Sequence, residues 1–340
     1  MHEIRFCQYS ELSLLKKFLI EHWKENHILA LSSELFQWQH INKQDKSVNF
    51  VVAYNTITKE FDAILGFIPT SQYDNNIKDQ DIWLAIWKVK EEFMKTGIGL
   101  EVFLFLVNKY KSSTIGAIGI SEDAAKIYKA FKYEIGVLEH FYIKNEQCNE
   151  NFIASLSQQN KENKDKREVN SFNVIKSINK DEFLSSNIEL KFIPRKSKKY
   201  YINRYYKNPF YNYDFNGIIY KDNLISVFIS RKVFVQNYIC IRIVDWIGPF
   251  PKDMYYQFQI MLQENNAEYI DLLCKIPNKS ELKEMGFKEK NPEKHIIPNY
   301  FEPFLKENVY IQYGFKSKRK NYAIFKGDSD QDRPNKIGGI

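Results

Sequence analysis

Hydrophobic and polar residues alternate so that the first part of the chain divides into short strands and amphipathic helices. The stretch 11–24 carries apolar residues at the spacing of one helix face, directly after Ser10, which is the expected N-cap. Residues 82–87 are almost continuously apolar, as in a strand that is buried on both faces. The predicted strands are 3–8, 49–55, 61–69, 81–89, 114–120 and 133–144, and the predicted helices are 11–24, 100–109 and 122–131. This mixture predicts an α/β (α+β) fold.

A polar stretch marks the end of this first block. After Leu156 the chain has almost no apolar side chain until residue 170, which is typical of a linker. We therefore expect a domain over residues 1–145, a linker over 146–170, a second domain over 171–326 and a polar tail over 327–340. The length of 340 residues suits two domains.

The second block repeats the order of elements found in residues 81–143. Its predicted strands are 217–220, 224–234, 237–247 and 269–275, and its predicted helices are 253–265 and 280–285. Gly286 follows the last helix, as expected of a residue that ends a helix. We therefore expect two domains of similar topology.

Composition and charge exclude several classes of protein. The apolar content of 44%, with little Gly or Pro, excludes extended disorder and collagen-like sequences. The net charge of +7 favours anionic partners such as nucleotides, coenzyme phosphates, nucleic acid or a membrane surface. The absence of a leader and of a long apolar run predicts a cytoplasmic protein without membrane insertion. The cysteines lie far apart, which predicts reduced thiols and no metal site: Cys7, Cys148, Cys240 and Cys274.

A glycine-bearing turn between a strand and a helix is the strongest candidate for chemistry. Val89 ends the predicted strand, and Gly97 and Gly99 stand just before the helix. Glycines let backbone N–H groups approach a phosphate closely, and a helix N-terminus adds partial positive charge. The third glycine of a dinucleotide fingerprint is replaced by Val102, and the Gly-Lys-Ser/Thr of a Walker loop is absent. A helix start that uses glycine only for its dihedral freedom is the alternative.

The segment from Val89 to Leu100 resembles the acyl-CoA-binding turn of the GCN5-related N-acetyltransferase superfamily. Val89, Gly97 and Gly99 match the pattern of that turn, whereas Met94 replaces its usual Arg or Gln. The resemblance implies tandem domains, each a mixed, mostly antiparallel sheet flanked by helices, with an acyl-CoA held mostly by backbone amides. The implied contacts are Lys88, Val89, Met94, Lys95, Thr96, Gly97, Ile98, Gly99 and Leu100.

A second motif of the same superfamily follows in residues 121–133. Ala124, Tyr128 and Tyr133 fit its helix, and Lys132 replaces the usual glycine. In relatives the tyrosine at the position of Tyr128 protonates the departing thiolate of the coenzyme, which a phenol can do at neutral pH. A packed helix aromatic beside Phe131 is the alternative.

The resemblance also implies a reaction. The coenzyme, acetyl-CoA or another acyl-CoA, would lie beside the strand 83–89, and a neutral amine would attack the thioester directly. The ammonium proton must then leave, and the candidate bases are His27 and Asp81. Gln72 and Asp74 are candidate contacts to the acceptor. Each of these residues has an equally ordinary role in a loop or turn, and a site without a dedicated base is the alternative.

The second block is expected to shape the acceptor site rather than to bind a coenzyme. Its turn 248–252 carries two prolines, which lack the amide donors that a pyrophosphate needs. The region 191–215 mixes basic residues, Arg195 and Arg204 among them, with tyrosines that suit a nucleotide. A helix with lysines toward solvent and tyrosines toward the core is the alternative.

Further segments resemble two-domain acyltransferases of bacterial surface-glycan biosynthesis, including the anthrose pathway. These segments are 22–29, 36–40, 65–70, 81–87 and 328–335. The resemblance implies acyl transfer from acyl-CoA to the amine of a nucleotide-linked amino sugar, with no nucleic-acid partner. A tandem transferase that uses aminoacyl-tRNA and a non-catalytic nucleotide-sugar-binding protein are the alternatives; the first would explain the positive charge.

Overall fold

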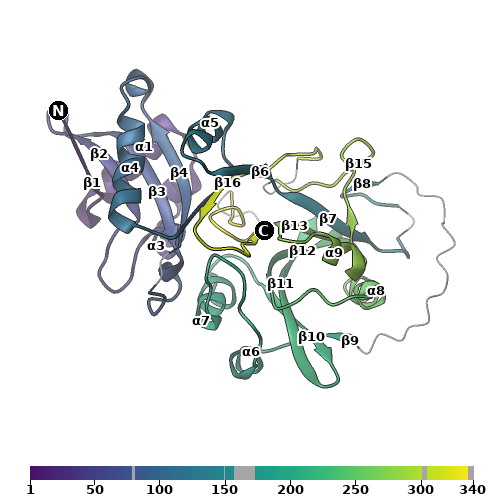
Figure 1. Cartoon of the computed structure of the whole chain (residues 1–340). Helices are drawn as coiled ribbons and strands as arrows, with labels where there is room; N and C mark the ends of the chain where they lie inside the picture. The colour runs from purple at the N-terminus through teal and green to yellow at the C-terminus, as the bar shows by residue number, and fades with distance from the viewer. Residues whose placement is uncertain (79–80, 149, 157–172, 301–304, 336–340) are drawn as a thin grey trace.

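Two large sheets, each covered by helices, form the molecule (Figure 1). The computed structural model describes residues 1–78, 81–148, 150–156, 173–300 and 305–335. The first half contains β1 (His2–Phe6), α1 (Leu12–His22), α2 (Ile28–Leu31), α3 (Ser33–His40), β2 (Phe50–Asn55), β3 (Phe61–Pro69), β4 (Ile82–Val89), α4 (Ile98–Tyr110), β5 (Thr114–Ile118), α5 (Glu122–Ala130), β6 (Glu134–Val137) and β7 (Glu139–Lys144). The second half contains β8 (Ser155–Leu156), β9 (Asn173–Ser177), α6 (Lys180–Ser185), α7 (Lys198–Tyr201), η4 (Ile202–Tyr206), β10 (Asp214–Tyr220), β11 (Asn223–Val235), β12 (Tyr238–Ile247), α8 (Tyr255–Glu264), β13 (Ala267–Lys275), α9 (Ser280–Met285), β14 (Lys288–Glu289), β15 (His295–Ile296), β16 (Gln312–Ser317) and β17 (Ile324–Phe325). The predicted α/β fold is confirmed.

The first sheet opens into a fork between two parallel strands. Its order is β1-β2-β3-β4-β5-β16-β6, and β4 and β5 are its parallel neighbours. These two strands pair only from Ile82 to Leu84 on one side and from Ile115 to Ala117 on the other. Beyond Leu84, β4 continues to Val89 without β5 beside it. We call this opening the first fork.

Helices cover the two faces of the first sheet separately. Helix α4 packs on β1 to β4, and its apolar residues share one cluster with residues of α5. Helices α1, α2 and α3 pack on the opposite face in a different cluster. A ligand in the first fork can therefore be approached from two sides, one lined by α4 and α5 and the other by α1 to α3.

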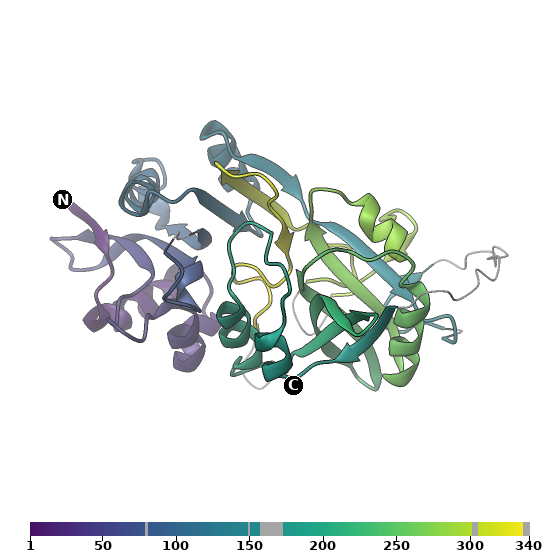
Figure 2. The same cartoon turned by 60° about the horizontal axis from the view of Figure 1, so that its bottom comes forward.

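The two halves exchange one strand each. Strand β16, from near the end of the chain, lies between β5 and β6 in the first sheet. Strand β7, from the first half, lies between β13 and β14 in the second sheet. The predicted single strand over 133–144 is therefore wrong. The strand is interrupted at Leu138, so β6 and β7 join different sheets (Figure 2). Each sheet needs a strand from the other half, and the domain limits expected from the sequence stay a prediction.

The second sheet repeats the strand order of the first. Its order is β14-β7-β13-β12-β11-β10-β9, with β12 and β13 as parallel neighbours. Helix α8 follows β12 through the proline-containing turn, and α9 ends at Gly286, whose φ of 114° suits glycine. The order strand, turn, helix, strand, helix that was predicted for residues 237–287 is confirmed.

Two local predictions in the first half need correction. Ser10 does not cap α1, because residues 9–11 form a short 3-10 turn and Gln8 and Glu11 make the capping contacts. Helices α2 and α3 were not predicted, because each spans only eight residues or fewer and such short segments carry little periodic signal. Ser121 does cap α5, as expected, and accepts a hydrogen bond from the backbone N–H of Ala124 at 3.3 Å.

The predicted linker and tail differ from freely solvated segments. Residues 157–172 of the linker lie outside the described residues, but Ile153 and Ala154 are buried and β8 pairs with β15. In the tail, residues 336–340 lie outside the described residues, whereas residues 327–335 pass between the two halves (Figures 1 and 2). Asp328 is fully buried there and Asp332 is 3% exposed. We call residues 324–335 the C-terminal segment.

Candidate active site

The glycine turn lies at the open end of β4 and leads directly into α4. Gly97 caps this helix with a φ of 86°, a left-handed conformation that favours glycine. Gly99 is required for a different reason: a Cβ built there would lie 2.8 Å from Cγ2 of Val89. The turn therefore brings the start of α4 into close contact with the end of β4, as the sequence predicted.

Several backbone amides of this turn are unused. The N–H groups of Met94 and Thr96 donate to carbonyls inside the turn, and that of Ile98 donates to Oγ1 of Thr96. In the described part of the chain, the N–H groups of Lys95, Gly97 and Gly99 donate to no acceptor. The turn is exposed to solvent. Free amides at a helix N-terminus bind phosphate oxygens, so residues 94–99 can hold a diphosphate.

Aromatic side chains pack between α4 and α5 beside this turn. Trp87 of β4 stacks on Phe103 with ring centroids 5.4 Å apart and donates its indole N–H to the carbonyl of Gly99 at 3.1 Å. Tyr128 of α5 packs against Trp87 at 5.7 Å and against Tyr133 at 5.2 Å. Burial raises the pKa of Tyr128 well above its ordinary value. Its hydroxyl is therefore protonated at neutral pH, as a proton donor must be.

Lys132, which stands where the motif usually has glycine, does not disturb the end of α5. Lys132 adopts a positive φ of 62°, where relatives of this motif have glycine. The N–H of Tyr133 donates to the carbonyl of Tyr128 at 3.0 Å and closes the helix end. The motif is thus preserved in shape although not in sequence.

The C-terminal segment crosses the first fork from the side of α1 to α3. The Ser329 hydroxyl lies 3.4 Å from the carbonyl oxygen of Leu84, and the Gln331 amide donates to the carbonyl of Ile118 at 3.1 Å. These two carbonyls belong to β4 and β5 at the point where the strands separate. The sequence analysis placed this segment in a polar tail, although residues 328–335 were among the segments that resemble the two-domain acyltransferases.

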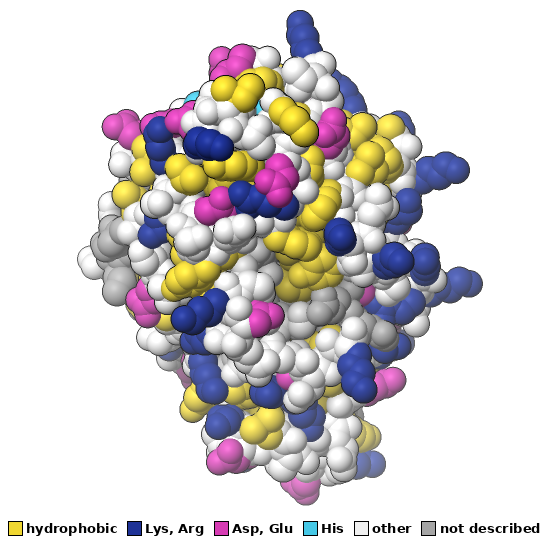
Figure 3. Space-filling model, turned by 90° about the vertical axis from the view of Figure 1, so that its left-hand side faces the viewer, with side chains coloured by type: hydrophobic (Ala, Val, Ile, Leu, Met, Phe, Trp, Pro, Cys, Tyr) yellow, Lys and Arg dark blue, Asp and Glu magenta, His cyan; other side chains and the backbone are white. Residues whose placement is uncertain are grey.

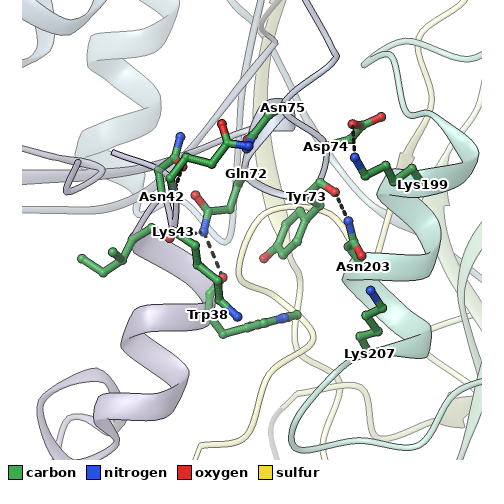
Figure 4. A pocket seen from close by; sticks show the side chains of 12 residues that line it. Trp38, Asn42, Lys43, Gln72, Tyr73, Asp74, Asn75, Lys199, Asn203 and Lys207 are labelled. Atoms are coloured by element: carbon green, nitrogen blue, oxygen red, sulfur yellow. Dashed lines mark hydrogen bonds and ion pairs between the residues drawn. The ribbon is translucent and has the colours of Figure 1, made fainter. Parts of the chain in front are cut away.

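A pocket of about 350 Å³ opens between the two halves of the chain (Figure 4). Its lining comes from the end of α3, from the turn after β3, and from α7 and η4: Trp38, Ile41, Asn42, Lys43, Gln44, Gln72, Tyr73, Asp74, Asn75, Lys199, Asn203 and Lys207. The side chains of Lys43, Lys199 and Lys207 are exposed around it. Sequence reasoning missed Trp38 and Asn203, because only the packing of α3 against the second half brings them together.

The two acceptor contacts predicted near residue 70 both line this pocket. The Gln72 side chain donates to the carbonyls of Trp38 and Ile41 at 3.0 Å and accepts from Asn49 at 2.8 Å. Asp74 accepts from the hydroxyl of Ser197 at 2.6 Å. These bonds hold the pocket wall in place, so both residues shape the pocket as well as facing it.

The two predicted arginines occupy different environments. Arg204 is 2% exposed and donates to the hydroxyl of Tyr73 at 2.6 Å and to the carbonyls of Gly327 and Ser329 at 2.9 Å. It therefore joins the pocket wall to the C-terminal segment that crosses the first fork. Arg195 has an exposed side chain, and its backbone N–H donates to Asp81 at 2.9 Å. Arg195 does not line the pocket.

The tyrosine-rich region around Arg204 fits the alternative that the sequence left open. Tyr200, Tyr201 and Tyr205 are buried in the core, while Lys199 is exposed. The aromatic rings thus face inward rather than toward a ligand. The contribution of this region to the pocket comes from Lys199, Asn203 and Lys207 instead.

His27 has a structural contact that limits its use as a base. It is 5% exposed, and its Nδ1 accepts the N–H of Leu29 at the start of α2. Burial and, to a smaller extent, the nearby Arg333 lower the pKa of His27 to about 4. His40 of α3, which the sequence did not single out, is fully buried nearby, and burial lowers its pKa to about 3. Both imidazoles are weak bases.

Asp81 directly precedes β4, at the end where β4 and β5 pair with each other, and lies away from the glycine turn. It is fully buried, forms an ion pair with Arg319 and accepts the backbone N–H of Arg195. These contacts tie β4 to both ends of the second half. The structure thus separates Asp81 from Tyr128 and from the turn, and the contacts give it a structural role.

The second sheet has a similar fork, but the chain itself fills it. Strand β17 pairs with β13 at Cys274 and Lys275, and the N–H of Gly327 donates to the carbonyl of Val244 at 2.8 Å. The gap between the ends of β12 and β13 is therefore occupied. This is a stronger obstacle to a coenzyme than the prolines that the sequence pointed to.

The first fork and its turn define the class of this fold. No family model matches the sequence, and no curated protein matches it. Among solved structures, the chain is similar to a GCN5-related N-acetyltransferase from Anabaena variabilis ATCC 29413, with a TM-score of 0.53 and 11% identity, over 92% of this chain and 72% of that one. A putative acetyltransferase from Pyrococcus horikoshii gives a TM-score of 0.47 and 12% identity, over 94% of this chain and 91% of that one. The first similarity shows the fold of a GCN5-related N-acetyltransferase.

The described residues lack both a metal-binding cluster and a helix that could span a membrane. No cluster of three or more His, Cys, Asp or Glu side chains suited to a metal ion occurs among them. None of the described helices is both long and apolar enough to cross a bilayer. All four cysteines are unpaired, as expected. Lys and Arg side chains project along the right-hand edge of the view in Figure 3.

Proposed function

We propose that this protein transfers an acyl group from acyl-CoA to an amine. The observation that carries the proposal is the first fork, where a parallel strand pair separates beside a turn with three free amides at a helix N-terminus. The amides of Lys95, Gly97 and Gly99 would bind the coenzyme diphosphate. The contacts proposed with the coenzyme are those expected from the sequence: Lys88, Val89, Met94, Lys95, Thr96, Gly97, Ile98, Gly99 and Leu100.

The proposed chemistry is direct attack of the amine on the thioester. The nitrogen forms a bond to the carbonyl carbon, the carbon–sulfur bond breaks, and the thiolate takes a proton. Tyr128 faces the gap between α4 and α5 as a protonated phenol and is the proposed donor of that proton. Tyr128→Phe should lower kcat while the Kd for acetyl-CoA stays unchanged, because the ring and its packing remain.

We further propose a nucleotide-linked amino sugar as the acceptor. Arg204 links Tyr73 in the pocket wall to Ser329, which lies at the first fork. Lys43, Lys207 and Lys199, which also pairs with Asp74 at 3.6 Å, surround the pocket with positive charge suited to a diphosphate. Trp38 adds an aromatic surface for a base. These features support the acceptor class and a place in surface-glycan biosynthesis, and leave the acyl group and the sugar to experiment.

The test begins with the donor. Acetyl-CoA is titrated into the protein by calorimetry, and release of free CoA is then followed with a thiol reagent over a panel of nucleotide-linked amino sugars that includes UDP-glucosamine. We expect binding that Gly99→Val abolishes, because the new side chain would push α4 away from Val89. No heat at millimolar acetyl-CoA would overturn the proposed function.

A further inference from the structure

The C-terminal segment carries three aspartates, and one of them differs from the other two. Asp328 is held by Lys196 at 2.7 Å. Asp332 is held by Arg231 at 3.0 Å and by the hydroxyl of Tyr213 at 2.6 Å. Asp332 is therefore held by a cation of its own, whereas Asp328 shares Lys196 with Asp245, and burial raises the pKa of Asp328 to about 6.

Asp330 lacks such a tight partner among its described contacts. Its Oδ1 accepts from Nε2 of Gln331 at 3.1 Å and lies 3.5 Å from the Ser329 hydroxyl, and its Oδ2 lies 3.4 Å from Nε of Arg333. It is nevertheless only 5% exposed. A buried carboxylate with such long contacts has oxygen lone pairs available for a further, closer hydrogen bond.

The neighbours of Asp330 fix its place relative to the first fork. Ser329 and Gln331, on either side of it, contact the carbonyls of Leu84 and Ile118, where β4 and β5 separate. A Cβ at Gly119 would lie 2.8 Å from the Gln331 amide, so this glycine allows the segment to approach the end of β5 closely. The backbone of Asp330 is thus held across the first fork.

The groups that interact electrostatically with Asp330 indicate on which side of the first fork it lies. They are His27 between α1 and α2, His40 at the end of α3 and Tyr73 after β3, and Arg333 of the segment itself lies 3.4 Å away. All the elements of the first half in this set lie on the face opposite α4 and α5. The coenzyme turn lies at the start of α4, so Asp330 approaches the first fork from the side left for the acceptor.

We propose that Asp330 is the catalytic base, contacting the acceptor amine and taking its proton as the amine attacks the thioester. The inference rests on the proposed function. The balance is complete: the carbon–nitrogen bond forms, the carbon–sulfur bond breaks, the nitrogen proton passes to the Asp330 carboxylate, and the thiolate leaves. The exchanged strand β16 serves this arrangement, because it returns the chain to the first sheet just before the segment begins.

The test compares two small amines that need no specific acceptor pocket. Both amines lose a nitrogen proton on attack, but hydroxylamine is only weakly basic and gives this proton up readily to water. Ethylamine is strongly basic and is an ammonium ion at neutral pH, so its reaction depends much more on a base. Release of CoA from acetyl-CoA is measured with each amine for the wild type, Asp330→Asn and the matched control Asp328→Asn. Thermal unfolding and calorimetry with acetyl-CoA are recorded for every variant.

For Asp330→Asn we expect the rate with ethylamine to fall about 100-fold or more, the usual contribution of a general base, and the rate with hydroxylamine to stay within about twofold. Asp328→Asn should unfold at a lower temperature yet keep the wild-type ratio of the two rates. Equal losses with both amines, or no loss, would overturn the assignment of Asp330. Wild-type protein that binds acetyl-CoA but acylates neither amine would overturn it as well, whereas absence of acetyl-CoA binding would overturn the proposed function itself.

Discussion

Mild acid should destabilise the folded chain through three buried histidines. His27 caps α2, His40 ends α3, and His140 lies on β7 beside Asp271. Burial lowers the pKa of His27 and His140 to about 4 and that of His40 to about 3, from the ordinary value of 6.5. Each imidazole is therefore neutral in the folded state at a pH where the unfolded chain already binds a proton.

The sign and size of the effect follow from proton linkage. The unfolded state binds more protons between pH 6.5 and pH 4, so the free energy of unfolding decreases as the pH falls through that window. For one histidine with a folded pKa of about 4, the loss between pH 7 and pH 5 is about 2 kcal/mol. Three independent histidines would give a total of about 5 kcal/mol, a large part of the stability of an ordinary domain.

The measurement is urea unfolding at pH 7 and pH 5, followed by tyrosine and tryptophan fluorescence. His40→Gln serves as the variant, because an amide can still donate to the carbonyl of Phe67, which lies 3.2 Å from Nδ1 of His40. It should be less stable than the wild type at pH 7 but should lose about 2 kcal/mol less on going to pH 5. A wild type with the same free energy of unfolding at both pH values would refute the reasoning.

Further predictions concern the glycine turn and the buried ion pair that holds the C-terminal segment. Gly97→Ala should reduce the free energy of unfolding by about 1–2 kcal/mol through its left-handed backbone alone, since a Cβ there meets nothing within 4 Å; urea unfolding checks this. Gly99→Ala should weaken acetyl-CoA binding in calorimetry, and adding Val89→Ala should restore it by removing the methyl group that the new Cβ meets; no rescue would contradict the packing argument. Lys196→Met should lower stability by about 3–5 kcal/mol in urea unfolding, because it leaves Asp245 and Asp328 buried without their cation, whereas an unchanged midpoint would show that the folded state does not depend on this ion pair.

Local sequence signals located the glycine turn between β4 and α4. The apolar run before Val89, the pair Gly97 and Gly99, and the helical periodicity after them all act over a few residues. Such patterns depend on backbone dihedrals and on which face of one element is apolar. The helix α4 was therefore predicted to within two residues at its start.

Only some of the residues that line the pocket between the two halves could be predicted from the sequence. Gln72 and Asp74 were singled out and do line the pocket, whereas Trp38 and Asn203 reach it from α3 and η4, far apart in sequence. Arg204 was predicted to contact a nucleotide but is buried, because its donors satisfy the carbonyls of a segment more than a hundred residues away. Polar residues give no periodic signal that reports such partners.

The sequence by itself determined the elements, their order and the turn at the start of α4, since each depends on contacts among neighbouring residues. Only the tertiary structure decided that β16 and β7 change sheets and that the C-terminal segment fills one fork and crosses the other. A strand's pattern of side chains specifies which face is buried but not which neighbour it pairs with. The alternating aspartates therefore read as a polar tail, although Lys196, Arg231 and the first fork bury them.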